Sequence, residues 1–374
     1  LLDDGWLGNG PYSRDDDKHG LGDWEPSTKK LPRGLSYIAK EALKRKVDFG
    51  IWLEPEMVNP QSELYQKHPD WIITQPKRTP ILGRHQEILD LTRPEVQAFE
   101  WQVIDKTLRP NPDISYVKWD CNRYITQPGS GYLQPAEQSH LWIDYNWALY
   151  RLMERFSKEF PNVMAMLCAG GSGRVDYGAL PYFHSFWPSD NTDPLGRIKI
   201  QWGFSHFFPA STISAHVTRM GKRHLKLAID VALSGAFGID LALDKATAEE
   251  RVQIADAVKL YKASIRPLVM QGELYRLVSP YEHPMASLSY VSTDKNDAVV
   301  YLYQIQDGSV PQVILGGLDA RKNYRVEEVG LPKGSTSRFP GHGKIFSGAE
   351  LMSTGIANPL NAQFESAILL LKTQ

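Results

Sequence analysis

The sequence has little of what marks several large classes of protein. It has two cysteines, Cys121 and Cys168, among 374 residues, which is too few for a disulfide scaffold. It has no Asn-x-Ser/Thr glycosylation acceptor, no apolar run long enough to cross a bilayer and no opening signal-peptide pattern. We therefore expect a soluble chain with no membrane partner. Its compartment, cytoplasm or periplasm, stays open.

Charge of one sign is also lacking. Lys and Arg total 42 against 43 for Asp and Glu, a formal net charge of −1 with no basic run, which argues against a nucleic-acid partner. The ten histidines form no His-Glu-x-x-His cluster, so we expect no catalytic metal. The Gly-rich stretch 168–173 lacks the Gly-Lys-Ser/Thr end of a phosphate loop. We expect no cofactor.

Aromatic residues, in contrast, are plentiful. They make up 11% of the chain and include 10 Trp. Aromatic platforms with little net charge suit a neutral, hydroxyl-rich ligand such as a sugar. A core rich in tryptophan would give the same composition, so the motifs have to decide.

Short β-rich runs alternate with segments of helical period over residues 1–272. Such alternation predicts a parallel sheet with helical crossovers. The helix at 93–108 is expected to have Thr92 as its N-cap, and the one at 247–270 to open with a Thr247-x-x-Glu250 capping box. The expected strands are 1–4, 48–54, 114–120, 163–169, 182–190, 212–217 and 237–243. The expected helices are 34–46, 93–108, 141–160, 225–233 and 247–270.

The strand count is one short of a closed barrel. A (β/α)8 barrel needs eight strands, and the seven found here begin at the first residue. We therefore expect an upstream strand and helix to be missing. After residue 272 the pattern changes to strands joined by Gly, Asp, Asn and Pro turns, which predicts a separate antiparallel β domain over 273–374. Its expected strands are 288–291, 298–304, 312–315, 324–329 and 366–371.

Polar residues gather at the ends of five successive strands, where a parallel barrel carries its functional side chains. Buried charges there are costly unless they are paired or used. The side chains at these ends are Asp3 and Asp4, Trp52 and Glu54, Lys118 and Asp120, Cys168 with Gly170 and Gly171, and Ser189, Asp190 and Asp193.

The most informative segment is Lys118-Trp119-Asp120-Cys121-Asn122-Arg123. Strand alternation places Lys118 and Asp120 on one face, where the lysine would keep the carboxylate ionised and nucleophilic. A plain ion pair at a strand end would look the same. Asp190 and Asp193 offer a second carboxylate, and a glycosidase needs two. Asp193 precedes Pro194 and a helix, so it also reads as an N-cap.

Taken together, the motifs resemble glycoside hydrolase family 36, the α-galactosidases related to melibiases and to raffinose-type galactosyltransferases. The resemblance covers residues 1–272. It implies a TIM-type (β/α)8 barrel followed by a C-terminal antiparallel β-sandwich, and the family's N-terminal supersandwich has no counterpart here. The matching motifs are Asp3-Asp4-Gly5-Trp6, Trp52-Leu53-Glu54-Pro55-Glu56-Met57, Lys118-Trp119-Asp120-x-Asn122, Cys168-x-x-Gly171-x-x-Arg174 and Ser189-Asp190-x-x-Asp193.

The resemblance also implies roles for residues. Asp120 would be the nucleophile and Asp190 the acid/base. Asp3 and Asp4 would bind O4 and O6 of galactose, Trp52 would be an apolar sugar platform, and Cys168 with Gly171 would line the side of the 2-hydroxyl. The implied substrate-binding set is Asp3, Asp4, Trp52, Arg84, Lys118, Asn122, Cys168, Gly171 and Arg174.

We therefore expect a retaining exo-α-galactosidase acting on α-galactoside oligosaccharides, with its two carboxylates about 5 to 5.5 Å apart. An α-galactosyltransferase and an α-N-acetylgalactosaminidase would use the same fold. A non-catalytic sugar-binding fragment and a metal-dependent sugar isomerase are rivals of other classes. A homo-oligomer is left open.

Overall fold

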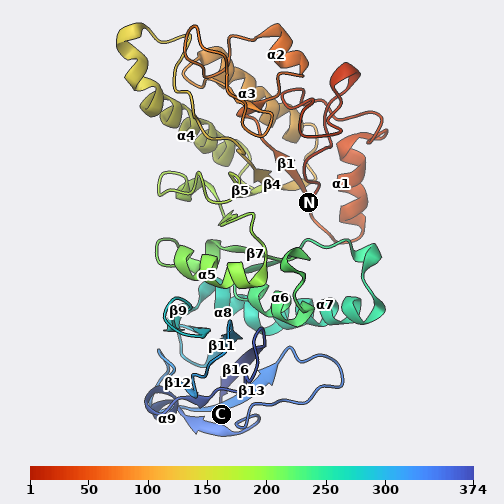
Figure 1. Cartoon of the computed structure of the whole chain (residues 1–374). Helices are drawn as coiled ribbons and strands as arrows, with labels where there is room; N and C mark the ends of the chain where they lie inside the picture. The colour runs from red at the N-terminus through yellow and green to blue at the C-terminus, as the bar shows by residue number, and fades with distance from the viewer. The chain divides into compact units, whose positions relative to one another are not determined.

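The computed structural model describes residues 1–374, which form two compact units, Leu1–Trp187 and Pro188–Gln374 (Figure 1). No helix in either unit is both long enough and apolar enough to cross a membrane. Short 3₁₀ helices occupy Gly10–Tyr12, Pro135–His140, Leu180–Tyr182, Ala210–Thr212, Met220–Lys222 and Leu243–Lys245.

The first unit is built on a four-stranded parallel sheet in the order β1-β4-β5-β6. The expected strand 1–4 is reduced to a single parallel bridge between Leu2 and Ile51 of β1. That bridge nevertheless places Asp3 and Asp4 directly after the edge of the sheet. The strands are β1 (Phe49–Leu53), β4 (Ile114–Trp119), β5 (Met164–Leu167) and β6 (Ser185–Phe186).

The three expected helices of this unit are present as α1 (Gly34–Lys44), α3 (Pro94–Leu108) and α4 (Leu141–Glu159). The predicted cap of α3 was wrong: Arg93 is the N-cap residue, and the Thr92 hydroxyl donates to Asp90 Oδ1 at 2.6 Å instead. Between β1 and α3 the chain adds elements that the sequence did not predict. They are β2 (Met57–Val58), α2 (Glu63–Lys67) and β3 (Glu87–Ile88).

The second unit opens with helices around the parallel pair β7–β8. Thr247 forms the predicted capping box, because its hydroxyl accepts from the Glu250 amide at 3.2 Å while Glu250 Oε2 accepts from the Thr247 amide at 3.0 Å. The single helix expected at 247–270 is broken by a π-helical turn over Tyr261–Ile265. The elements are α5 (Pro194–Phe204), β7 (Ser214–Val217), α6 (Leu225–Ala232), β8 (Ala236–Ile239), α7 (Ala248–Leu260) and α8 (Arg266–Gln271).

A six-stranded antiparallel sheet in the order β14-β13-β16-β11-β10-β9 completes the second unit. The ribbon β12–β15 and helix α9 contribute Val313, Ile356 and Leu351 to the core on one face of this sheet. The sequence missed β9, β14, β15 and α9. The elements are β9 (Glu273–Val278), β10 (Met285–Val291), β11 (Asp297–Gln304), β12 (Gln312–Val313), β13 (Asn323–Val329), β14 (Ile345–Ser347), α9 (Gly348–Ser353), β15 (Ile356–Ala357) and β16 (Ser366–Thr373).

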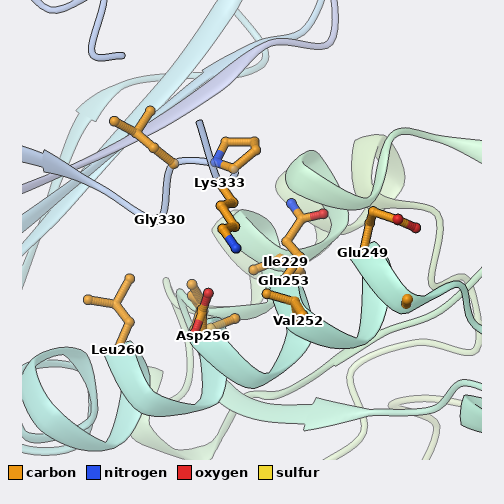
Figure 2. Close-up of a pocket in the computed structure, with 13 residues that line it drawn as sticks. Ile229, Glu249, Val252, Gln253, Asp256, Leu260, Gly330 and Lys333 are labelled. Carbon is orange, nitrogen blue, oxygen red and sulfur yellow. The ribbon is translucent and has the colours of Figure 1, made fainter. Parts of the chain in front are cut away.

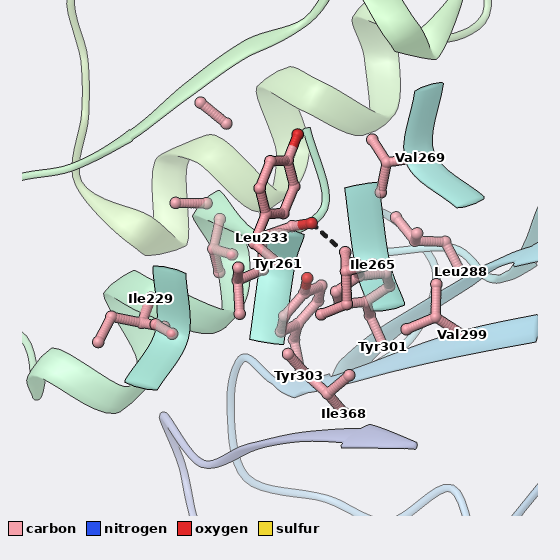
Figure 3. Packing of buried hydrophobic residues seen from close by; sticks show 14 of the residues in the cluster. Ile229, Leu233, Tyr261, Ile265, Val269, Leu288, Val299, Tyr301, Tyr303 and Ile368 are labelled. Carbon is pink, nitrogen blue, oxygen red and sulfur yellow. Dashed lines mark hydrogen bonds between the residues drawn. The ribbon is translucent and has the colours of Figure 1, made fainter. Parts of the chain in front are cut away.

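The other face of the sheet packs on the helices of the same unit. Residues of α6, α7 and α8 share one buried cluster with β10, β11 and β16 (Figure 3). The Tyr301 hydroxyl donates to the Leu233 carbonyl at 2.8 Å, Tyr290 to Ser234 at 2.8 Å and Tyr303 to Asp230 at 3.1 Å. The last carbonyls of a helix have no partner inside it. These tyrosines supply hydrogen-bond donors to carbonyls at the C-terminal end of α6 and just after it.

Candidate active site

Asp120 stands at the end of β4 with a fixed carboxylate. Its side chain is buried, at 4% exposure. Oδ1 accepts from the Cys121 amide at 2.8 Å, and Oδ2 accepts from the indole nitrogen of Trp52 at 3.0 Å. Each oxygen thus has a donor that sets its position, while its remaining lone pairs stay available for a ligand.

Trp52, on the neighbouring strand β1, supplies that donor. Its ring is 1% exposed and lies 5.9 Å from the ring of Trp24. The indole nitrogen of Trp6 donates to the Trp52 carbonyl at 2.9 Å. Trp52 is thus buried and donates a hydrogen bond to Asp120, and its role as an apolar sugar platform stays a prediction.

Lys118 is two residues before Asp120 and forms an ion pair with Asp3, with 2.9 Å between Nζ and Oδ2. Burial acts to lower the pKa of Lys118. The carboxylate of Asp3, with Cys168 and Asp120, outweighs burial, so the pKa lies above its ordinary value. The acidic groups around Lys118 thus favour its charged form.

Asp4 has a partner that the sequence did not reveal. The Arg14 guanidinium binds both of its oxygens, with Nε to Oδ1 at 3.0 Å and Nη2 to Oδ2 at 2.7 Å. Arg14 is 3% exposed, and its Nη1 donates to Asn59 Oδ1 at 3.1 Å. A two-pronged contact of this kind fixes the plane of a carboxylate. Since Arg14 lies in a loop without periodic pattern, no sequence signal marked it.

Glu54 is a second carboxyl group close to the nucleophile candidate. Its side chain is 0% exposed, Oε1 accepts from the Asn122 backbone amide, and Oε2 accepts from Gln86 Nε2 at 3.2 Å. Burial, together with the like charge of Asp120, raises the pKa of Glu54 to about 8. Glu54 was noticed at its strand end but was not assigned a role from the sequence.

The loop after β5 meets the segment that follows Asp120. The Asn122 side-chain oxygen accepts from the Gly170 amide at 3.1 Å. Gly171 has φ of +106° and is buried, and its carbonyl accepts from the Ala169 amide at 2.8 Å. A side chain at that φ would be strained. Cys168, 1% exposed, begins the loop.

Arg174 and Arg84 were both expected to bind substrate. Arg174 forms an ion pair with buried Glu56 at 3.1 Å, and Glu56 also accepts from the Tyr145 hydroxyl at 2.5 Å. This ion pair ties the loop after β5 to the segment after β1 that contains Glu56. The Arg84 side chain is 44% exposed and lies 3.6 Å from Asp17, in a turn with φ of +53°.

Asp190 belongs to the second unit. It is exposed, in the segment before α5, and its charge acts on buried Arg197. Burial lowers the pKa of Arg197 to about 10, and Asp190 opposes that effect. Asp193 is the N-cap of α5, as its position before Pro194 suggested, with its carboxylate accepting from the Leu195 amide at 3.4 Å.

A cavity of about 550 Å³ lies elsewhere in the second unit, between α6, α7 and the loop after β13 (Figure 2). Its lining is largely apolar, with Glu249, Asp256 and Lys333 as charged members. None of the candidate site residues lines it. No group of three or more His, Cys, Asp or Glu side chains is arranged to hold a metal ion.

Comparison with known families gives two matches along the chain. Residues 1–272 match the family model described as melibiase, and residues 285–371 match the model of the glycosyl hydrolase family 36 C-terminal domain.

Individual relatives agree with these matches. The chain is 39% identical over 368 residues to alpha-galactosidase AgaA of Geobacillus stearothermophilus, covering 96% of this chain and 48% of the relative. The crystal structure of AgaB from the same organism matches with a TM-score of 0.91 and 39% identity, covering 100% of this chain and 50% of that one. A variant of AgaA in complex with raffinose matches with a TM-score of 0.91 and 38% identity, covering 100% and 51%.

The chain thus spans about half the length of these relatives. The matches confirm the predicted fold class, a TIM-type barrel followed by a C-terminal antiparallel β domain.

Proposed function

The chain belongs to the melibiase family, and on that premise we propose that it carries the catalytic part of a retaining exo-α-galactosidase. Asp120 attacks the anomeric carbon of a terminal α-galactose, and Asp190 protonates the departing oxygen. Asp190 then takes a proton from water, which releases galactose from the aspartyl ester. No cofactor enters either step.

The observation that carries this proposal is the arrangement around Asp120. A buried carboxylate held by two donors is suited to in-line attack, because its position is set before the substrate arrives. Lys118 and Asp3 in the same unit form an ion pair, and Asp4 is fixed by Arg14. These polar groups can bind sugar hydroxyls with directional, charge-assisted hydrogen bonds.

Raffinose-type oligosaccharides are the proposed substrates, since a relative is known in complex with raffinose. The division into a catalytic barrel of residues 1–272 and a β domain of residues 273–374 belongs to the same proposal. So do the substrate-binding roles of Asp3, Asp4, Trp52, Arg84, Lys118, Asn122, Cys168, Gly171 and Arg174. We propose roles for Cys168 and Gly171 at the 2-hydroxyl, where a 2-acetamido group would need more room.

The test is hydrolysis of raffinose and of an aryl α-galactoside, followed by NMR of the first-formed sugar. Retention requires that α-galactose appears first. β-Galactose as the first product would exclude the double displacement. Galactosylated sugars in place of free galactose, at high acceptor concentration, would identify a transferase.

A further inference from the structure

Two carboxyl groups are buried at adjacent strand ends of the first unit, and the reaction proposed above uses only one of them. Asp120 at the end of β4 is 4% exposed, and Glu54, directly after β1, is 0% exposed. A second anion beside the nucleophile would repel it. A second buried carboxyl group therefore suits this site best when it is uncharged. We propose that Glu54 acts as a neutral carboxylic acid that positions the nucleophile, an inference that rests on the proposed function.

The two carboxyl oxygens of Glu54 contact two different segments of the chain and hold them together. One oxygen accepts from the Asn122 amide, two residues after Asp120, and the other contacts the side-chain amide of Gln86 at 3.2 Å. Asn122 in turn binds Gly170 through its side chain. Glu54 therefore ties the segment after Asp120 to the turn that contains Arg84 and Gln86.

The Gln86 contact also suits a protonated acid. Gln86 Oε1 is buried without a hydrogen-bond partner. Turning the amide over exchanges its oxygen and nitrogen without moving the other atoms. After this exchange the hydroxyl of neutral Glu54 donates to the amide oxygen over the same heavy-atom contact, and the amide nitrogen becomes the buried group without a partner. The Gln86 contact therefore fits either protonation state of Glu54.

The charges that face Glu54 come from several elements. Asp120 opposes its ionisation, whereas Arg14 and Arg84 favour it, and Cys121 is a further titratable group nearby. Burial is the largest influence, and with the like charge of Asp120 it holds the pKa of Glu54 at about 8. Above that pH two buried carboxylates would repel each other, so the brace should loosen and kcat should fall.

Three variants separate bracing from mere packing. Glu54→Gln keeps the shape and the neutral hydrogen bonds, whereas Glu54→Met keeps the bulk and loses them. Glu87→Gln is the matched control, because Glu87 is also buried, at 2% exposure, and burial raises its pKa to about 7. Each variant is assayed for kcat and KM on an aryl α-galactoside from pH 5 to 9.5.

Glu54→Met should lower kcat by about 100-fold with KM nearly unchanged, since a small displacement of a reacting group costs that much. Glu54→Gln should recover most of that loss and remove the fall in kcat near pH 8. Glu87→Gln should keep the fall. Equal losses in the Gln and Met variants, or a fall in kcat that persists in Glu54→Gln, would overturn the inference.

An infrared titration of the carboxylic-acid C=O stretch tests the same idea without any assay of turnover. The wild-type chain should lose the Glu54 acid band near pH 8, apart from the Glu87 band near pH 7, and Glu54→Gln should lack only the Glu54 band. In Asp120→Asn the band should disappear at lower pH, because the like charge has gone. If the wild type showed these infrared changes but hydrolysed no α-galactoside, the proposed function would fail, whereas the inference that Glu54 is neutral would hold. If the band titrated at the same pH in Asp120→Asn as in the wild type, the interaction between Glu54 and Asp120 would be refuted.

Discussion

The two proposed catalytic carboxylates, one in each unit, lie in opposite surroundings. Asp120 is buried and held by the Cys121 amide and the Trp52 indole, whereas Asp190 is exposed in the segment before α5. A nucleophile has to be ionised and in place before the substrate arrives, so fixed donors suit it. An acid/base has to exchange a proton with each turnover, so access to water suits it. The difference in surroundings matches the difference in the proposed roles.

Replacing the buried member should have the largest effect. Asp120→Asn removes the attacking oxygen anion but keeps the shape, so galactosylation is lost whatever the leaving group. We expect kcat/KM to fall on the order of 10⁴-fold or more on both raffinose and an activated aryl galactoside. Steady-state assays on the two substrates measure this. Activity within tenfold of the wild type would remove Asp120 from the chemistry.

Replacing the exposed member should have a smaller effect that depends on the substrate. Asp190→Asn should cost about 10² to 10⁴-fold on raffinose, whose leaving group needs a proton. An activated aryl galactoside needs none, so the enzyme should still be galactosylated and azide should restore turnover. The measurement is the ratio of kcat/KM for the aryl galactoside to kcat/KM for raffinose, with and without azide. If Asp190→Asn and Asp120→Asn respond alike, the assigned roles are wrong.

The selectivity for galactose should depend on Asp4 and on the arginine that holds it. Asp4→Ala should lower kcat/KM for α-galactosides by tenfold to a few hundredfold, because an axial O4 would lose its acceptor. α-Glucosides should be affected far less. Arg14→Met should reproduce much of this loss by freeing the Asp4 carboxylate. Parallel losses on both sugars would make Asp4 a structural residue.

The smallest effect on catalysis is expected where a buried carboxylate has only a structural role. Asp230 on α6 is 0% exposed and is paired with Lys226 and Ser366. Lys226→Met leaves that charge unpaired, which should cost about 3 kcal/mol of stability and lower Tm by several degrees without changing kcat at 25 °C. The double variant Lys226→Met with Asp230→Leu should recover most of the Tm. Calorimetry would contradict the assignment if the single variant melted like the wild type.

The sequence predicted the elements whose pattern is local. The runs that became β1, β4 and β5 are short and β-rich, and the capping box at Thr247 is a four-residue signal. What failed depends on partners far along the chain. Thr92 was expected to cap α3, but Asp90 takes its hydroxyl. Strand β9 was missed because it is defined by its pairing with β10 and not by a pattern in its own residues.

The candidate site follows the same rule. Motif order was enough to single out Asp120, Lys118 and Asp3, which the structure brings together at neighbouring strand ends. The ion pair between Arg14 and Asp4 was not predictable, since no sequence spacing links an arginine in a loop to a carboxylate at a strand end. The burial that keeps Glu54 neutral is likewise a property of the packed unit and not of the motif.

The tyrosines that bind the end of α6 also bear on how the chain can be divided. The two family models are separated between residues 272 and 285, but the hydroxyls of Tyr290, Tyr301 and Tyr303 cross that division to carbonyls of residues 230–234. A chain cut at 272 would leave three carbonyls without donors and an apolar helix face in water. The interval between the two family models is therefore not a place where the chain divides into parts that fold independently, and we expect a protease or a cloning strategy that cuts there to yield insoluble fragments.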